Sequence, residues 1–202
     1  MAHKRITWEM FDYINADKTT AFENLCNLLF KRMFFDKKTI FQSIPNNPGV
    51  EIAPIYSRTV NKRISFQSKY FTSEDNKYAQ IKKSAKATIA NYKGEIDVVY
   101  LYSNKKLNTK CKAYTDIEKL LNDEKIELVP IVDEEILNTV IEYPELSQMY
   151  FNTGRLTIEW FREKFEESKD IIGPRYTPNF NVETEAEKHL NLFINSCCRC
   201  VY

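Results

Sequence analysis

The stretch Asn46–Phe71, NNPGVEIAPIYSRTVNKRISFQSKYF, decides how the rest of this chain is interpreted. After a Pro-Gly break it contains two segments that alternate apolar and polar residues, Val50–Ser57 and Arg63–Phe71. Alternation of this kind is typical of strands that bury one face. The polar residues RTVNK between the two segments favour a turn, so we expect a hairpin.

Each strand of the expected hairpin carries polar side chains. Glu51 lies on the first strand, and Gln67 and Lys69 lie two positions apart on the second, so that both point to the same side. A carboxylate and an amide oxygen on neighbouring strands are ligands that Mg²⁺ accepts, and the peptide carbonyl of Ser68 offers a third. Lys69 could orient a water or stabilise charge on a phosphate. The pattern therefore indicates phosphodiester hydrolysis, with a solvated polar face as the alternative.

The segments around the hairpin predict an α/β fold with a parallel or mixed central sheet. EIDVVYLYS (95–103) and IELVPI (126–131) are apolar runs typical of buried central strands. Because segments with helical spacing alternate with these runs, we expect helices to flank the sheet. The expected helices lie at about 16–35, 73–92, 114–123 and 132–141.

Beyond Tyr143 the pattern is mainly helical, in PELSQMYF and GRLTIEWFREKFEES, before a Pro-containing segment and a cysteine-rich tail. We therefore expect a core domain at 1–142, followed at 143–202 by a helical extension and tail that pack on this core. The tail sequence CCRC has no second Cys or His pair at zinc-ligand spacing, so a structural zinc site is disfavoured.

The 202 residues carry a net charge of +1, but the charge is unevenly distributed. Arg58–Lys110 contains 12 basic and 4 acidic residues, whereas Tyr114–Asp170 contains 6 and 15. The basic half includes the hairpin and the cluster Lys82, Lys83 and Lys86 on the helix that follows. An anionic partner would explain this distribution, and an ordinary solvated face is the alternative.

The compartment expected from the sequence is the cytosol. The five cysteines show no spacing of a disulfide framework, which favours a reducing environment. The chain opens with no signal-peptide pattern, and no apolar run approaches the ~18 residues that a membrane span needs. We therefore expect no membrane partner.

The hairpin and the helices around it resemble the PD-(D/E)xK nuclease superfamily. The resemblance is carried by Glu23 on a helix, then PGVE and FQSK on adjacent strands, then another helix. The chain looks closest to the restriction-endonuclease-like branch related to Mrr-type enzymes, which use Gln-x-Lys in the last motif. The longer pattern from about Phe22 to Glu183 also resembles the N-terminal nuclease effector of bacterial antiphage STAND NTPases of the AVAST kind.

The resemblance implies a role for each matching residue. Glu51 matches the first metal-binding acid, Gln67 the second acidic position and Lys69 the lysine, so Glu51 and Gln67 would hold the metal. Glu23 matches the helical acid that assists the metal in many members, although an acid near a helix N-terminus also simply complements the helix dipole. Gln80 matches a further amide used by some relatives. The usual Pro-Asp is here Gly-Val-Glu, and the amide at the second position lowers the negative charge, which should weaken metal affinity.

The implied fold has a restriction-endonuclease-like mixed central sheet flanked by helices, with a helical C-terminal extension. The implied activity is a Mg²⁺-dependent endodeoxyribonuclease, with Mn²⁺ as a substitute, that cleaves double-stranded DNA with little sequence specificity in bacterial antiphage defence. Lys82, Lys83 and Lys86 would contact phosphates. The chain contains no GxxxxGK[ST] motif, so a STAND-type ATPase regulator would lie outside it.

Three points stay open on the sequence alone. Cleavage of both strands requires two sites, which favours a homo-oligomer in the bacterial cytoplasm. A catalytically inactive nucleic-acid-binding or oligomerisation module of the same fold is the main alternative function. A nuclease that acts on RNA or on single strands is a third, but the tyrosines Tyr78, Tyr92, Tyr100 and Tyr102 lie mainly in apolar patterns typical of a core.

Overall fold

The computed structural model describes residues 6–36, 48–73, 76–153 and 156–172, and side chains as far as residue 169. The chain divides into two compact units, Met1–Leu156 and Thr157–Tyr202. The described part of the first unit contains four strands and six helices. The strands are β1 (Ile55–Ser57), β2 (Lys62–Lys69), β3 (Val98–Ser103) and β4 (Glu127–Val132). The helices are α1 (Trp8–Ile14), α2 (Lys18–Phe34), α3 (Lys77–Tyr92), α4 (Lys112–Asn122), α5 (Glu134–Ile141) and α6 (Pro144–Phe151).

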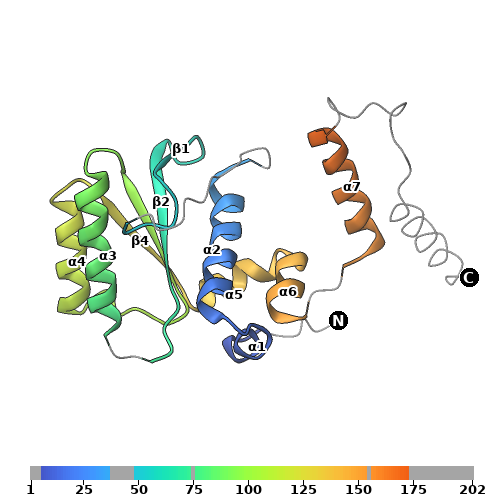
Figure 1. Ribbon diagram of the computed structural model, residues 1–202, viewed down its shortest axis with the longest axis horizontal. Helices are drawn as coiled ribbons and strands as arrows, with labels where there is room; N and C mark the ends of the chain where they lie inside the picture. The colour runs from blue at the N-terminus through green and yellow to red at the C-terminus, as the bar shows by residue number, and fades with distance from the viewer. Residues whose placement is uncertain (1–5, 37–47, 74–75, 154–155, 173–202) are drawn as a thin grey trace, which may run out of the picture. The chain divides into compact units, whose positions relative to one another are not determined.

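The strands form one mixed sheet with the order β1-β2-β3-β4 (Figure 1). β1 pairs antiparallel with β2, whereas β2–β3 and β3–β4 are parallel. Helices α3 and α4 cover one face of the sheet, and α2 lies on the other face with α5 and α6 (Figure 1). The expected α/β class, with a mixed sheet flanked by helices, is confirmed.

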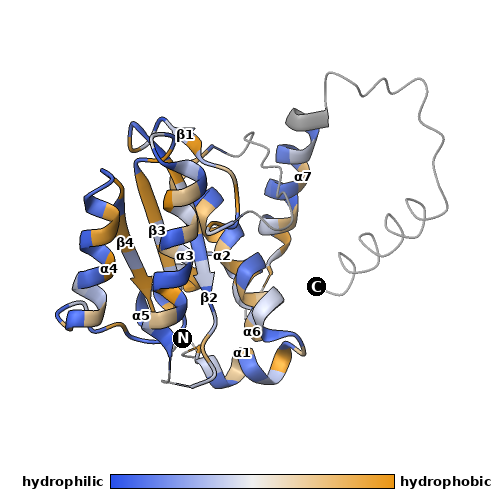
Figure 2. Cartoon of the chain, turned by 60° about the vertical axis from the view of Figure 1, so that its left-hand side comes forward, coloured by the Kyte–Doolittle hydropathy of each residue, from blue (hydrophilic) through white to orange (hydrophobic). Residues whose placement is uncertain are grey.

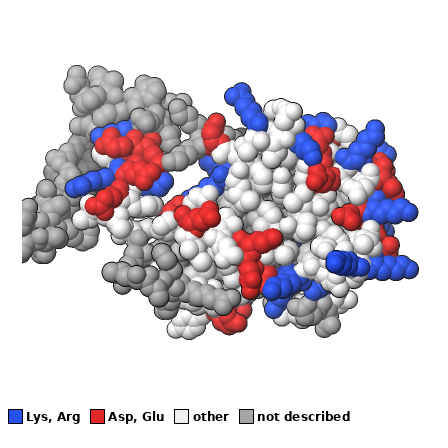
Figure 3. Space-filling model, turned by 180° about the vertical axis from the view of Figure 1, so that it is seen from behind, with Lys and Arg blue, Asp and Glu red and all other residues white. Residues whose placement is uncertain are grey.

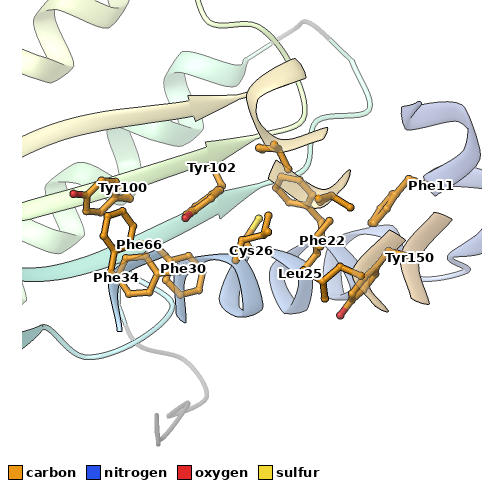
Figure 4. Close-up of a cluster of buried hydrophobic side chains, with 14 of the residues drawn as sticks. Phe11, Phe22, Leu25, Cys26, Phe30, Phe34, Phe66, Tyr100, Tyr102 and Tyr150 are labelled. Atoms are coloured by element: carbon orange, nitrogen blue, oxygen red, sulfur yellow. The ribbon is translucent and has the colours of Figure 1, made fainter. Parts of the chain in front are cut away.

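Alternation along β2 and β3 separates two hydrophobic cores. Phe66, Tyr100 and Tyr102 face α2, where they pack against Phe30 and its aromatic neighbours (Figure 4). The intervening residues of β3 face α3 and α4, so every residue of β3 is buried. In Figure 2, β3 and β4 are largely hydrophobic, and α3 and α4 carry their hydrophilic residues outward. This two-sided burial explains why β3 reads as a continuous apolar run.

The expected first strand of the hairpin is shorter than its pattern predicts. Only Ile55–Ser57 pairs as a strand, Val50 to Ile52 form a bend, and Ala53 and Pro54 are irregular. Val50 enters the core beside α3 and α4, whereas Ile52 enters the core beside α2, so the two apolar residues of this segment are buried on opposite sides of the sheet. Glu51 therefore lies in a bend beside β2 and not on a strand.

Two helix boundaries and one helix differ from expectation. The helix expected from residue 73 begins at Lys77, after Asn76 in the left-handed conformation with φ 60°. The helix expected near residue 16 begins at Lys18, because the Asp17 side chain accepts the Thr20 N–H and caps it. Helix α1 has no sequence expectation; it is short and is held by tertiary contacts such as the Trp8 indole bond to Asp133 (2.8 Å).

The expected domain boundary after residue 142 falls between α5 and α6. Helix α6 belongs to the first unit, where Leu146 and Phe151 are buried in the core beside α2. The second unit contributes one described helix, α7 (Ile158–Ile172), where the sequence predicts a helix. The expected extended segment GPRYTPNFNVET and the terminal cysteines lie outside the described residues. No described helix is long and apolar enough to cross a membrane.

Candidate functional site

The C-terminal end of β2 is held in place by backbone and amide contacts on the β3 side. Gln67 is in register with Leu101, and Lys69 with Ser103. Beyond the strand, the buried Asn104 side chain accepts the Phe71 N–H (2.7 Å) and donates to the Phe71 carbonyl (3.0 Å). The Asn104 side-chain amide thus makes the two hydrogen bonds that the backbone of a neighbouring strand would make to Phe71. The backbone at Lys69 is therefore fixed on both its N-terminal and C-terminal sides.

Glu51 is fixed against the opposite edge of β2. Its N–H donates to the Phe66 carbonyl (2.9 Å), and its Oε1 accepts both the N–H (2.9 Å) and the hydroxyl (3.0 Å) of Ser68. In a strand the N–H and C=O of one residue point to the same edge, so the Ser68 carbonyl faces the edge on which Glu51 lies. This arrangement gathers carboxylate and carbonyl oxygens at one place.

Glu23, Glu51 and Lys69 form an electrostatic cluster from three separate elements. Burial lowers the pKa of the Lys69 ammonium, and the Glu51 and Glu23 carboxylates offset part of this shift. Burial also raises the pKa of Glu23, and the like charge of Glu51 raises it further. The fully buried Cys26, one helical turn after Glu23, has its thiol pKa raised by burial first and then by Glu51 and Glu23.

This cluster is unfavourable for stability. An ammonium and a carboxylate are kept partly out of water, and two carboxylates lie within reach of one cation. Lys69 interacts with both acids through space and not through a direct hydrogen bond. Clusters with such shifted pKa values are enriched at functional sites.

Gln67 lies on the α3 side of the sheet with 2% of its surface exposed. Its amide nitrogen donates to the Gly49 carbonyl and to the Thr88 hydroxyl (3.2 Å) on α3. Its amide oxygen is buried and accepts no hydrogen bond from the described residues. A buried acceptor without a donor costs about 1–3 kcal/mol, so this oxygen opposes stability unless a ligand binds it.

These contacts connect four of the five residues expected at the hydrolytic site. Glu23, Glu51 and Lys69 interact electrostatically through space, and the Gln67 amide bonds to Gly49, two positions before Glu51. The remaining one, Gln80, is exposed on the first turn of α3 and has no described contact with the other four.

Lys82, Lys83 and Lys86 are also exposed on α3, opposite the buried Ile81 and Ala85. In the face seen in Figure 3, basic and acidic side chains are mixed over the end of the first unit that carries α3 and α4. The uneven charge along the sequence therefore does not appear on this face as an area of one sign.

Three side chains have structural roles at the site that the sequence analysis does not predict. The Ser68 side chain and amide both hold Glu51, Asn104 extends the pairing of β2, and Thr88 holds Gln67. Thr88 carries a weak signal, because it is a polar residue on the buried stripe of a helix. Asn104 carries another, because it directly follows an apolar strand.

Oxygens of the kinds that a hard divalent cation accepts lie on β2 and beside it. Among the described residues, no group of three or more His, Cys, Asp or Glu could hold a metal ion. The oxygens available are instead the Glu51 carboxylate, the unpaired amide oxygen of Gln67 and the Ser68 carbonyl, with Glu23 nearby. Mg²⁺ and Mn²⁺ accept carboxylate, amide and carbonyl oxygens and retain several waters, so they need few protein ligands.

Comparison with known proteins assigns the chain to no family. No protein-family model matches it. No curated protein matches it closely enough to count as a relative.

Proposed function

We propose that this chain is a metal-dependent endonuclease that hydrolyses phosphodiester bonds in double-stranded DNA. The observation that carries the proposal is the convergence of Glu23, Glu51 and Lys69 at the end of β2, where the charge of Glu51 contributes to the shifted pKa values of both Glu23 and Lys69. The order of these residues along the chain resembles that of PD-(D/E)xK nucleases, and this resemblance suggests phosphodiester hydrolysis. The mixed sheet flanked by helices is compatible with the restriction-endonuclease-like fold.

The proposed division of labour follows from the chemistry of each side chain. Glu51 and Gln67 would hold Mg²⁺ or Mn²⁺, with Glu23 adding negative charge beside them. The metal would polarise a phosphate oxygen and make its bound water more acidic. Ser68 keeps one carboxylate oxygen of Glu51 in place, so the other is free to face the ion.

Lys69 would stabilise negative charge that develops on the phosphate. Its half-buried position lowers the local dielectric, which strengthens attraction to an anion relative to an exposed lysine. The ammonium would also orient the attacking water by donating a hydrogen bond to it. Both roles require an ammonium held at a fixed position, which the pairing on either side of Lys69 supports.

The substrate and setting are further parts of the proposal. Lys82, Lys83 and Lys86 would contact DNA phosphates without reading sequence. A second copy would cut the other strand, and a STAND-type ATPase outside this chain would control the activity. The expected setting is antiphage defence in the bacterial cytoplasm.

The test is cleavage of supercoiled plasmid in Mg²⁺ or Mn²⁺, with EDTA and Lys69→Ala as negative controls and Arg63→Ala as the matched cation control. Cleavage by the wild type and Arg63→Ala, but not by Lys69→Ala or in EDTA, is expected. Equal cleavage in all lanes, or none by the wild type, contradicts the proposal for this chain. Single-stranded DNA and RNA, as parallel substrates, test the choice of duplex DNA.

Calorimetric titration with Mn²⁺ separates an inactive fold from an active site. Measurable binding by the wild type, weakened by Glu51→Ala, is expected. DNA binding that metal does not alter, with no Mn²⁺ binding and no cleavage, would instead support the inactive nucleic-acid-binding module.

A further inference from the structure

We propose that Gly49 and Thr88 form an amide cradle that selects glutamine at position 67 and directs its side-chain oxygen to the metal. The inference rests on the proposed function for the identity of the ligand. It goes further in two respects. Gly49 and Thr88 are positioning residues, and their contacts favour glutamine over glutamate at position 67.

Both protons of the Gln67 amide nitrogen have acceptors within the cradle. One is directed to the Gly49 carbonyl and the other to the Thr88 hydroxyl, 3.2 Å away. If the amide were turned over, its oxygen would face the Gly49 carbonyl, and two acceptors would oppose each other. The network therefore defines which end of the amide is nitrogen. It leaves the oxygen as the only end that can bind a cation.

Thr88 is itself held in place. It is fully buried, and its hydroxyl lies 2.9 Å from the Gly49 carbonyl and 3.0 Å from the Ser84 carbonyl. A hydroxyl has one proton, which Thr88 donates in a hydrogen bond to these carbonyls. Its lone pairs therefore remain to accept a hydrogen bond from the Gln67 amide nitrogen. Thr88 thus acts as an acceptor toward the Gln67 amide.

Gly49 must lie this close to α3 for the cradle to form. Its φ is +85°, and a Cβ at this position would lie 2.4 Å from the Thr88 nitrogen and 2.7 Å from the Ser84 carbonyl. Only glycine combines this backbone conformation with this approach. Two positions later, the same segment delivers Glu51 to the edge of β2, so the cradle and the carboxylate are positioned together.

A glutamate at position 67 does not fit this cradle. Its two oxygens carry no proton at neutral pH, so they would face the Gly49 carbonyl and the Thr88 hydroxyl without a hydrogen bond to the former. The amide in place of the family's second acid is therefore matched to Gly49 and Thr88. Restoring the acid should damage the site rather than improve it.

The experiment compares Thr88→Val, Thr88→Ser and Gln67→Glu with the wild type, with Gln148→Glu as a glutamine-to-glutamate control at a half-buried position away from the site. The Gln148 amide nitrogen donates to the Asn152 side chain at the end of α6. The readouts are the Mn²⁺ dissociation constant by calorimetry and the thermal unfolding midpoint in EDTA. Thr88→Val preserves the shape of threonine and removes the hydroxyl, whereas Thr88→Ser does the reverse.

Thr88→Val is expected to weaken Mn²⁺ binding by roughly 10- to 100-fold, as loss of a group that orients a metal ligand typically does. Thr88→Ser should bind within about threefold of the wild type, well below that range. Gln67→Glu should lower the midpoint in EDTA by at least about 3 °C, the shift that corresponds to breaking one buried polar contact in a chain of this size. Gln148→Glu should change neither readout.

The cradle proposal is overturned if Gln67→Glu binds Mn²⁺ more tightly than the wild type and has an unchanged thermal unfolding midpoint. It is also overturned if Thr88→Val binds Mn²⁺ as tightly as the wild type. If the wild type binds no Mn²⁺, the proposed function fails. The midpoints in EDTA then decide the cradle separately. A lower midpoint for Gln67→Glu than for Gln148→Glu supports amide selection, and equal midpoints overturn it.

Discussion

The two ends of β2 carry the same kinds of charge in opposite electrostatic conditions. At one end, Arg63 pairs with Asp97 through its backbone N–H (2.7 Å) and its guanidinium (3.2 Å), and these bonds lower the pKa of Asp97. At the other end, six positions along, Lys69 lies near Glu51 and Glu23, where burial lowers the pKa of Lys69 and raises that of Glu23.

This comparison separates a charge pair that holds the fold together from one that the fold has to tolerate. The Arg63–Asp97 pair is largely exposed and directly bonded, so it joins β2 to the start of β3 at a small desolvation penalty. The Lys69 cluster is partly buried, unpaired by direct bonds and crowded with negative charge. A charge arrangement that opposes stability is expected where a protein binds or reacts with something else.

The largest expected difference between the two ends is in catalysis. Lys69→Ala should lower the plasmid cleavage rate by about 10²–10³-fold, because it removes a preorganised charge at the reacting phosphate. Arg63→Ala should leave the rate within about threefold, since an exposed pair far from the reaction contributes little. Initial rates under saturating Mg²⁺ measure both. Equal losses in the two variants would show that the ends do not differ in function.

The next effect is on metal affinity. Glu51→Gln keeps an acceptor for the Ser68 N–H but removes the charge, so Mn²⁺ binding should weaken by at least roughly 10-fold, as for disturbed metal sites generally. Asp97→Asn makes the same change at the other end and should leave Mn²⁺ affinity unaltered. Calorimetric titration of both variants makes the comparison. Weakened binding in Asp97→Asn would mean that the metal is not bound at the Lys69 end.

A smaller effect is expected on stability at the Arg63 end. Asp97→Asn should reduce the free energy of unfolding at pH 7 by about 0.5–1.5 kcal/mol, through weakened hydrogen bonds to Arg63. The folded pKa of Asp97 is below its unfolded value, so its contribution is present above about pH 4 and is lost as the pH falls through the folded pKa. Urea unfolding at pH 7 and pH 3 measures this. A difference between variant and wild type that persists unchanged at pH 3 would contradict the assignment.

The smallest effect, with the opposite sign, is expected for Glu23→Gln. The folded pKa of Glu23 is raised, so ionised Glu23 lowers stability above its unfolded pKa of about 4.3. The variant should therefore be at least as stable as the wild type at pH 7, and the difference should shrink as the pH falls below that value. The same urea series detects it. A Glu23→Gln variant that is less stable than the wild type at pH 7 would remove the contrast between the two ends.

Most of the fold could be predicted from local patterns. β3 and β4 were expected as buried strands and α2–α6 as helices, because apolar periodicity reports burial directly. The bend at Val50–Ile52 could not be predicted, since its apolar residues are divided between two cores that the sequence does not distinguish. Helix α1 could not be predicted either, because it depends on contacts such as Trp8 with Asp133, 125 positions away.

The candidate site, like the fold, has one part that the sequence predicts and another that depends on tertiary contacts. The sequence by itself determined which residue types were available and in what order: an acid on a helix, then Glu51, then Gln67 and Lys69 two positions apart. Only the tertiary structure decided that Lys69 is half buried near two acids, and that Thr88 and Gly49 orient the Gln67 amide. Periodicity along a chain specifies which face a side chain occupies. The pKa of a group and the orientation of an amide depend instead on neighbours that folding brings from distant positions.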